Sequence, residues 1–120
     1  MGKIAFIFPG QGSQQVGMGH DVSKQYAVAK AIFDLADEKL GYSLSKLCFD
    51  GPEEELRLTV HTQPALLTTS IALYSAMKEE LDRLPDFVAG HSLGEYSALV
   101  AAEAISFQDA VSVVQERGRL

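Results

Sequence analysis

The stretch Phe87-Val88-Ala89-Gly90-His91-Ser92-Leu93-Gly94-Glu95 decides the fold of this chain. Residues 87–91 form a short apolar run typical of a strand, and the residues from Leu93 to Ala104 predict a helix directly after it. Residues 90–94 match G-x-S-x-G, a pattern found where a strand turns sharply into a helix. Such a turn presents its central side chain outward, so Ser92 is the candidate nucleophile.

The chemistry of the turn explains its residue types. Glycines at positions 90 and 94 allow the strand and the helix to approach without side-chain clashes. The amide of Leu93 lies at the helix start, where it can stabilise the oxyanion of a tetrahedral intermediate with help from the helix dipole. Glycine and serine are common, so the pattern alone is weak evidence. The order strand, turn and helix makes a nucleophilic serine the favoured interpretation.

A second strand is predicted at the beginning of the chain. Lys3 to Phe8 is an apolar run stopped by Pro9-Gly10, as expected of a strand buried on both faces of a parallel sheet. The loop that follows, residues 10–19, is rich in glycine. It lacks the third glycine of a dinucleotide fingerprint, because position 15 is Gln. It also lacks the Lys-Ser/Thr pair of a phosphate-binding loop. Nucleotide phosphates are therefore not the expected ligand.

The remaining apolar periodicity predicts several helices. They cover residues 21–40, 43–49, 53–58, 65–84 and 106–120. The helix at 65–84 is apolar on nearly all faces, so it is expected to be central and buried. The sequence therefore predicts an α/β fold, in which a parallel sheet is flanked by helices and carries a strand–nucleophile elbow–helix unit, as in an α/β-hydrolase-like core.

The fold is expected to be incomplete in these residues. The apolar pattern of the last helix, at Val111, Val113, Val114 and Leu120, continues to the final position. Two strands also do not make a stable parallel sheet. Residues 1–120 are therefore expected to be the N-terminal part of a large α/β subdomain, with the remaining part of the same polypeptide as a necessary partner.

Composition narrows the functional classes. The 120 residues carry a net charge of −6, which argues against nucleic acid or an anionic membrane as partners. No export signal is recognised, and the single cysteine, Cys48, excludes an internal disulfide framework, so a cytoplasmic location is expected. Cys48 has no spaced His or Cys partner and is interpreted as a small buried hydrophobic residue.

Three segments together resemble a known enzyme family. They are Phe8-Pro9-Gly10-Gln11-Gly12-Ser13-Gln14, Gly90-His91-Ser92-Leu93-Gly94-Glu95 and Arg117. The combination resembles the malonyl-CoA:acyl carrier protein transacylases, whose fold is shared by the acyltransferase domains of fatty acid and polyketide synthases. The similarity runs over the whole chain and includes Gln63-Pro64-Ala65.

The resemblance implies an enzyme of fatty acid biosynthesis. It would transfer a malonyl group from malonyl-CoA to the phosphopantetheine thiol of acyl carrier protein through an acyl-serine intermediate. Coenzyme A thioester is then a substrate, and neither a metal nor a redox cofactor is required. The family's small ferredoxin-like subdomain and the rest of the large one would lie beyond residue 120.

The resemblance also implies residue roles. Ser92 is the expected nucleophile, and the amides of Gln11 and Leu93 form the expected oxyanion hole. Arg117 matches the arginine that pairs with the malonyl carboxylate, while His91 is expected to be structural or to line the substrate pocket. The family's catalytic histidine lies downstream of the elbow, outside this chain. Residues 1–120 alone are therefore expected to be inactive, because a serine is a weak nucleophile without a base.

Two alternatives remain open at this point. An α/β-hydrolase-type esterase or thioesterase uses the same elbow but gives no role to Gln11 or Arg117. A non-catalytic fragment would bind the carrier protein without chemistry, and Ser92 would then be dispensable.

Overall fold

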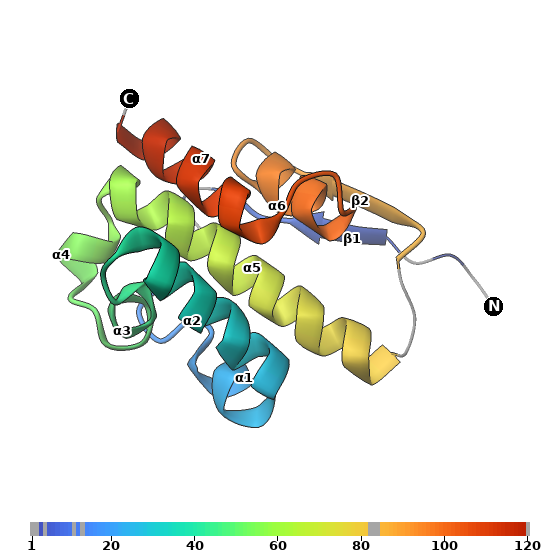
Figure 1. Ribbon diagram of the computed structural model, residues 1–120, viewed down its shortest axis with the longest axis horizontal. Helices are drawn as coiled ribbons and strands as arrows, with labels where there is room; N and C mark the ends of the chain where they lie inside the picture. The colour runs from blue at the N-terminus through green and yellow to red at the C-terminus, as the bar shows by residue number, and fades with distance from the viewer. Residues whose placement is uncertain (1–2, 4, 11, 13, 82–84, 120) are drawn as a thin grey trace.

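Two short parallel strands, β1 (Ala5–Phe8) and β2 (Phe87–Gly90), lie side by side in the computed structural model of this chain (Figure 1). Ala5 pairs with Phe87 and Phe8 with Gly90, so the carboxyl ends of the strands meet at the same edge of the sheet. The structure describes residues 3, 5–10, 12, 14–81 and 85–119. Over these residues the predicted parallel pairing is confirmed, and it brings the first loop to the serine turn.

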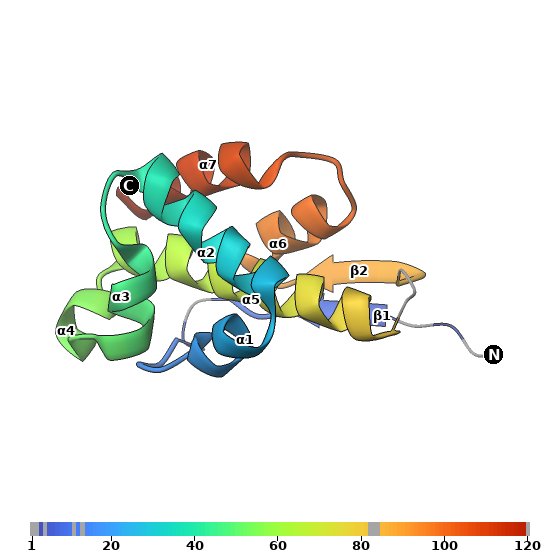
Figure 2. The ribbon, with the colours of Figure 1, turned by 60° about the horizontal axis from the view of Figure 1, so that its bottom comes forward.

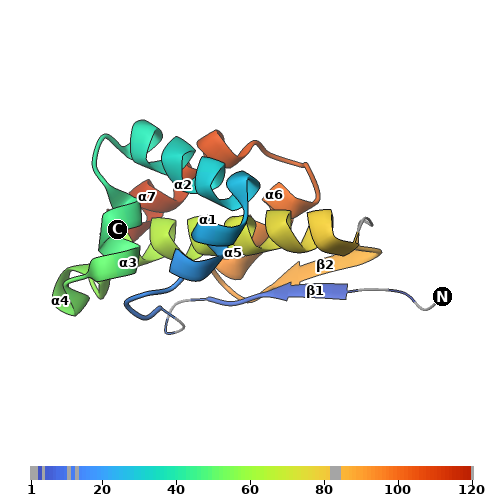
Figure 3. The ribbon, with the colours of Figure 1, turned by 90° about the horizontal axis from the view of Figure 1, so that it is seen from below.

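Only one face of this sheet is covered by the described residues. Phe8 is buried under the helices, whereas Ile7 and Phe87 on the opposite face are 79% and 58% exposed. Figure 3 shows α5 and α6 on one side of the strands and no helix on the other. The prediction of a strand buried on both faces is therefore wrong for this structure. The run of apolar residues indicates that both faces of the strand can be buried. The single layer of helices covers only one of these faces.

The central element is α5 (Thr59–Leu81), which runs through the middle of the molecule (Figure 1). All its residues from 62 to 72 are buried, so the predicted burial is confirmed for this half of the helix. The second half is more open, since Leu73 and Met77 are 44% and 46% exposed. The helix also begins earlier than the sequence predicts. Pro64, directly before the predicted start, therefore lies inside the helix.

In the described residues, four shorter helices precede α5. They are α1 (His20–Gln25), α2 (Ala27–Leu40), α3 (Leu44–Asp50) and α4 (Glu53–Leu56). The single helix predicted over residues 21–40 is in fact two, because Tyr26 adopts an extended backbone with φ −128° and ψ 118°. The Tyr26 hydroxyl donates a hydrogen bond to Glu80 of α5 at 2.6 Å, which ties this break to the central helix. Gly41, at φ 79°, ends α2 in the left-handed conformation that glycine adopts without strain.

In the part of the chain that the structure describes, the second strand is followed by α6 (Gly94–Ala101) and α7 (Phe107–Arg119). α6 packs on both strands, while α7 lies along α5 and α2 (Figure 2). Ser106 caps α7, since its hydroxyl accepts a hydrogen bond from the Asp109 amide at 3.1 Å. In the described residues, the largest fully buried side chains come from six helices and the elbow; among them are Phe33, Leu44, Leu56, Leu67, Leu93, Val111 and Val114.

No helix of the described residues is both long enough and apolar enough to cross a bilayer.

Candidate active site

Ser92 occupies a strained turn between β2 and α6. Its φ is 57°, in the left-handed region that a residue with a side chain rarely adopts. Such a conformation costs about 1–3 kcal/mol and persists only where the surrounding structure imposes it. The side chain is exposed at the carboxyl end of the sheet. The geometry is that of a nucleophile elbow.

Two backbone contacts impose this turn. A Cβ atom added at Gly90 would lie 1.9 Å from the Gly94 carbonyl oxygen, and one added at Gly94 would lie 2.2 Å from the Phe8 carbonyl oxygen. Neither neighbour can yield, because both contacts are with backbone rather than with a flexible side chain. The two glycines therefore let α6 start directly on the ends of both strands, and Ser92 is pushed outward between them.

Leu93 anchors the start of α6. Its side chain is fully buried, and its backbone is already helical, with φ −55° and ψ −34°. Amides at a helix start have no intrahelical acceptor, so they are available to an anion placed there. The position of Leu93 directly after Ser92 is compatible with an oxyanion-hole donor. Its predicted partner, Gln11, lies outside the residues that the structure describes.

Arg117 reaches Ser92 from the last turn of α7. Its Nη2 donates a hydrogen bond to the Ser92 Oγ at 3.0 Å, and its Nη1 donates one to the Gln63 Oε1 at 3.1 Å. The guanidinium also lies over the ring of Tyr96, with Cζ 5.5 Å from the ring centroid. A half-buried cation is thus held directly beside the candidate nucleophile, an arrangement that suits a substrate with a carboxylate near its reacting carbon.

Neither of the other two histidines contacts this site in the described structure. The His61 Nδ1 lies 2.9 Å from the Glu55 carbonyl oxygen, and the His20 ring packs on Phe49 at 5.1 Å. His91 is an elbow residue whose side chain is exposed and makes no hydrogen bond to Ser92 among the described residues. Its carbonyl accepts the Gly94 amide at 3.0 Å, so its backbone helps to close the turn. Its role as a substrate-lining residue stays a prediction.

Cys48 is not an alternative nucleophile to Ser92. It is fully buried, and burial raises the pKa of its thiol to about 12. The thiolate is the reactive form of cysteine, so this side chain is inert at neutral pH. Within the described residues, no cluster of His, Cys, Asp and Glu side chains could hold a metal ion.

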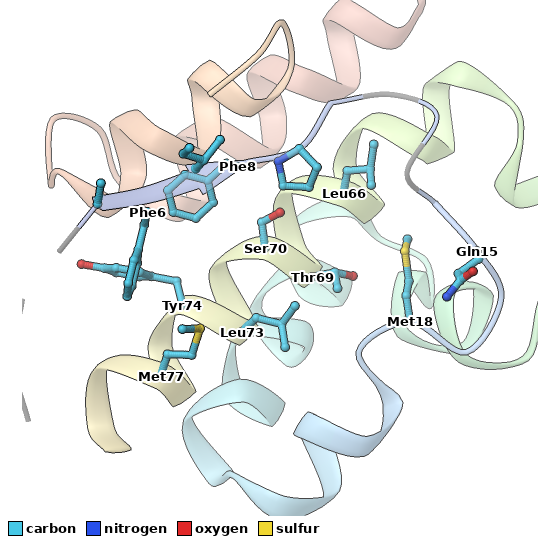
Figure 4. A pocket seen from close by; sticks show the side chains of 13 residues that line it. Phe6, Phe8, Gln15, Met18, Leu66, Thr69, Ser70, Leu73, Tyr74 and Met77 are labelled. Atoms are coloured by element: carbon cyan, nitrogen blue, oxygen red, sulfur yellow. The ribbon is translucent and has the colours of Figure 1, made fainter. Parts of the chain in front are cut away.

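An apolar hollow of about 450 Å³ lies between β1 and α5 (Figure 4). Its lining is mostly aliphatic and aromatic, including Phe6, Leu73 and Met77, with the hydroxyls of Thr69 and Ser70 among them. It includes neither Ser92 nor Arg117. The hollow belongs to the open flank of the sheet rather than to the serine site.

Three residues near Arg117 were not predicted from the sequence to belong to the site. Gln63 was noted only as part of a resembling segment, and Tyr96 and Gly118 were assigned no role. A Cβ atom at Gly118 would lie 2.7 Å from the Thr59 carbonyl oxygen, so this glycine allows α7 to touch the start of α5. For Gln63 the available signal was a polar side chain shortly before the apolar run that begins at Ala65.

Comparison with known proteins agrees with this geometry. Residues 5–120 match the family model described as "Acyl transferase domain". The chain belongs to the acyl transferase domain family. It is 61% identical over 118 residues to the malonyl CoA-acyl carrier protein transacylase of Bacillus subtilis and 51% identical over 119 residues to that of Escherichia coli. These matches cover 98% and 99% of this chain but only 37% and 38% of the two relatives.

Solved structures show the same relationship. An acyl-carrier-protein S-malonyltransferase from Burkholderia pseudomallei superposes with a TM-score of 0.93 at 49% identity, covering 98% of this chain and 38% of that one. A malonyl-transacylase in complex with its type II PKS acyl-carrier protein superposes with a TM-score of 0.93 at 47% identity, with the same coverage of both chains. The predicted fold class is confirmed, and this acyl transferase domain spans less than two fifths of the length of these proteins.

Gly90→Ala tests the close packing of the elbow in this acyl transferase domain. The added methyl group must displace the Gly94 backbone, so the free energy of unfolding is expected to fall by about 3 kcal/mol. Urea unfolding followed by circular dichroism measures it. Ala89→Ser, a small change at the exposed neighbouring position, is expected to shift it by no more than about 0.5 kcal/mol. Equal stability of the two variants would contradict the contact.

Proposed function

We propose that this acyl transferase domain is part of an enzyme that transfers a malonyl group from malonyl-CoA to acyl carrier protein. The observation that carries the proposal is the hydrogen bond between Arg117 and Ser92. An acyl group esterified to Ser92 begins at the atom that Arg117 already contacts. A carboxylate one carbon beyond the ester carbonyl therefore falls within reach of the guanidinium.

The proposed reaction has two steps through an ester on Ser92. The Ser92 oxygen gives its proton to the base expected downstream and attacks the thioester carbonyl. The negative charge that develops is stabilised by the amide of Leu93, with Gln11 as the expected second donor. The carbon–sulfur bond breaks, and coenzyme A takes the proton from the base and leaves as the thiol. The phosphopantetheine thiol of the carrier protein then gives its proton to the same base and attacks the ester, and the Ser92 oxygen takes that proton back as it is released.

Arg117 has two successive tasks in this scheme. Before acylation it donates to the Ser92 oxygen, which favours negative charge on that atom. After acylation the ester oxygen is a poor acceptor, and the guanidinium is free to pair with the malonyl carboxylate through two parallel hydrogen bonds. A neutral acyl group offers no such partner, so the site discriminates in favour of a dicarboxylic acyl group.

The names of the similar proteins support malonyl-CoA as the donor and acyl carrier protein as the acceptor. Malonyl CoA and acyl carrier protein appear in the names of the Bacillus subtilis and Escherichia coli relatives. An acyl-carrier protein is the partner in one similar structure. The negative charge of this chain stays consistent with the expectation that neither nucleic acid nor an anionic membrane is a partner. The cytoplasmic location remains a prediction.

An esterase or thioesterase is the weaker proposal. It accounts for the elbow equally well, but a neutral substrate would leave the guanidinium of Arg117 without a carboxylate partner.

The carboxylate role of Arg117 is tested in a chimera in which residues 1–120 replace the matching segment of the Bacillus subtilis transacylase. Arg117→Ala should lower the preference for malonyl-CoA over acetyl-CoA by about 10- to 100-fold, the loss of a charge-assisted pair. The rate of acyl-serine formation with each donor, followed by intact-protein mass spectrometry, measures the preference. Arg119→Ala is the matched control, since Arg119 is exposed and pairs with Glu116. An unchanged preference in Arg117→Ala would favour the esterase.

Residues 1–120 on their own are expected to form no malonyl adduct. We propose that they are the N-terminal part of a large α/β subdomain and that a histidine downstream supplies the base. Removal of the base of a serine enzyme lowers turnover by a factor on the order of 10⁶. Mass spectrometry of the 120-residue chain after exposure to malonyl-CoA tests this, with the chimera as the positive control. Labelling of Ser92 in the isolated chain would show that the described residues suffice.

A further inference from the structure

The guanidinium of Arg117 is held by groups from three separate elements. α5 contributes Gln63, the elbow contributes Ser92, and α6 contributes Tyr96. An arginine side chain loses up to about 2 kcal/mol of conformational free energy when it is fixed. Fixing its planar head in advance removes that loss from the moment of substrate binding. The surroundings of Arg117 therefore affect how well it pairs with a carboxylate.

Gln63 fixes one edge of the guanidinium. It is only 6% exposed and sits in the buried part of α5, where a polar side chain needs a hydrogen-bond partner. Its Oε1 accepts the Nη1 hydrogen, which leaves the Nη2 edge directed at Ser92. Because the carboxamide is neutral, the full positive charge of Arg117 remains available to a substrate. A carboxylate at this place would have cancelled it.

Tyr96 contacts the guanidinium through its ring. Its ring lies 5.5 Å from the Arg117 Cζ, within the range of a cation–π interaction. The ring comes from the first turn of α6, two residues after Gly94, so it moves with the elbow that carries Ser92. The orientation of Arg117 and the position of the nucleophile are thereby linked.

Gly118 sets the distance between the two helices that carry Arg117 and Gln63. A Cβ atom there would lie 2.7 Å from the Thr59 carbonyl oxygen and 2.8 Å from the Val60 Cα. The last turn of α7 thus packs directly on the backbone at the start of α5. This contact brings Arg117 within hydrogen-bond distance of Gln63, one turn further along α5.

We propose that Gln63 and Tyr96 are positioning residues that hold the Arg117 guanidinium beside the Ser92 oxygen and thereby set the preference for acyl groups that carry a second carboxylate. The inference rests on the proposed function. It adds that the preference depends on the residues that support the arginine as well as on the arginine itself.

The test uses the chimera described above and compares the rates of malonyl and acetyl loading on Ser92. Gln63→Met keeps the length of the side chain but removes the acceptor. It should lower malonyl loading about tenfold more than acetyl loading. Tyr96→Leu should lower malonyl loading about threefold more than acetyl loading, whereas Tyr96→Phe, which keeps the ring, should restore the original ratio. Gln108→Met, the same substitution at an exposed position of α7, should leave the ratio unchanged.

The outcomes separate three explanations. If Gln63→Met and Tyr96→Leu lower both loading rates by the same factor, the two residues are merely structural and the inference is wrong. If Arg117→Ala loses the malonyl preference while both of these variants keep it, the proposed function stands and the inference fails. If Arg117→Ala keeps the preference, the proposed function itself fails. A urea unfolding curve for each variant establishes that the comparison is made on folded protein.

Discussion

The backbone contact between Gly94 and Phe8 determines where Ser92 stands. With no side chain at position 94, the first turn of α6 rests on the end of β1, and Gly90 allows β2 to turn within the same space. The strain that this creates is concentrated at Ser92, whose φ is 57°. A side chain at either glycine would separate the sheet from the helix. The site would then be taken apart, because Ser92, the amide of Leu93 and the first loop would no longer lie together at the end of the strands.

α5 connects this turn to the remainder of the molecule. Its buried half supports the helices of the core, and its residue Gln63 reaches Arg117. One helix therefore contributes both to the stability of the fold and to the orientation of a charged group at the site. This arrangement explains how the polar side chain of Gln63 is accommodated in a buried stretch of α5. Its carboxamide oxygen accepts a hydrogen bond from the charged Arg117, so this buried oxygen is not left without a partner. It also means that the charge beside Ser92 depends on the packing of α7 against α5.

The local parts of this structure were predictable, and the parts that depend on distant packing were not. The elbow around Ser92 was readable because strand, glycines and helix are contiguous in the sequence. The place of Arg117 came from family resemblance, since no local pattern links positions separated by 25 residues. Gln63 was not predicted as a site residue, because the helix was expected to begin only at residue 65, whereas it begins at Thr59 and includes Gln63. The break between α1 and α2 at Tyr26 was not predictable, because no Gly or Pro marks it. The exposure of Ile7 was not predictable either, because it depends on what covers the sheet and not on the apolar pattern of the strand.

The central claim is that Arg117 pairs with the carboxylate of an acyl group carried by Ser92. It is tested most directly by a crystal structure of the chimera with a malonyl group trapped on Ser92. The account predicts that the Arg117 nitrogens lie about 3 Å from the oxygens of the malonyl carboxylate, with the hydrogen bond to Gln63 retained. A malonyl carboxylate that points into solvent, with the guanidinium making no contact to it, would contradict the account.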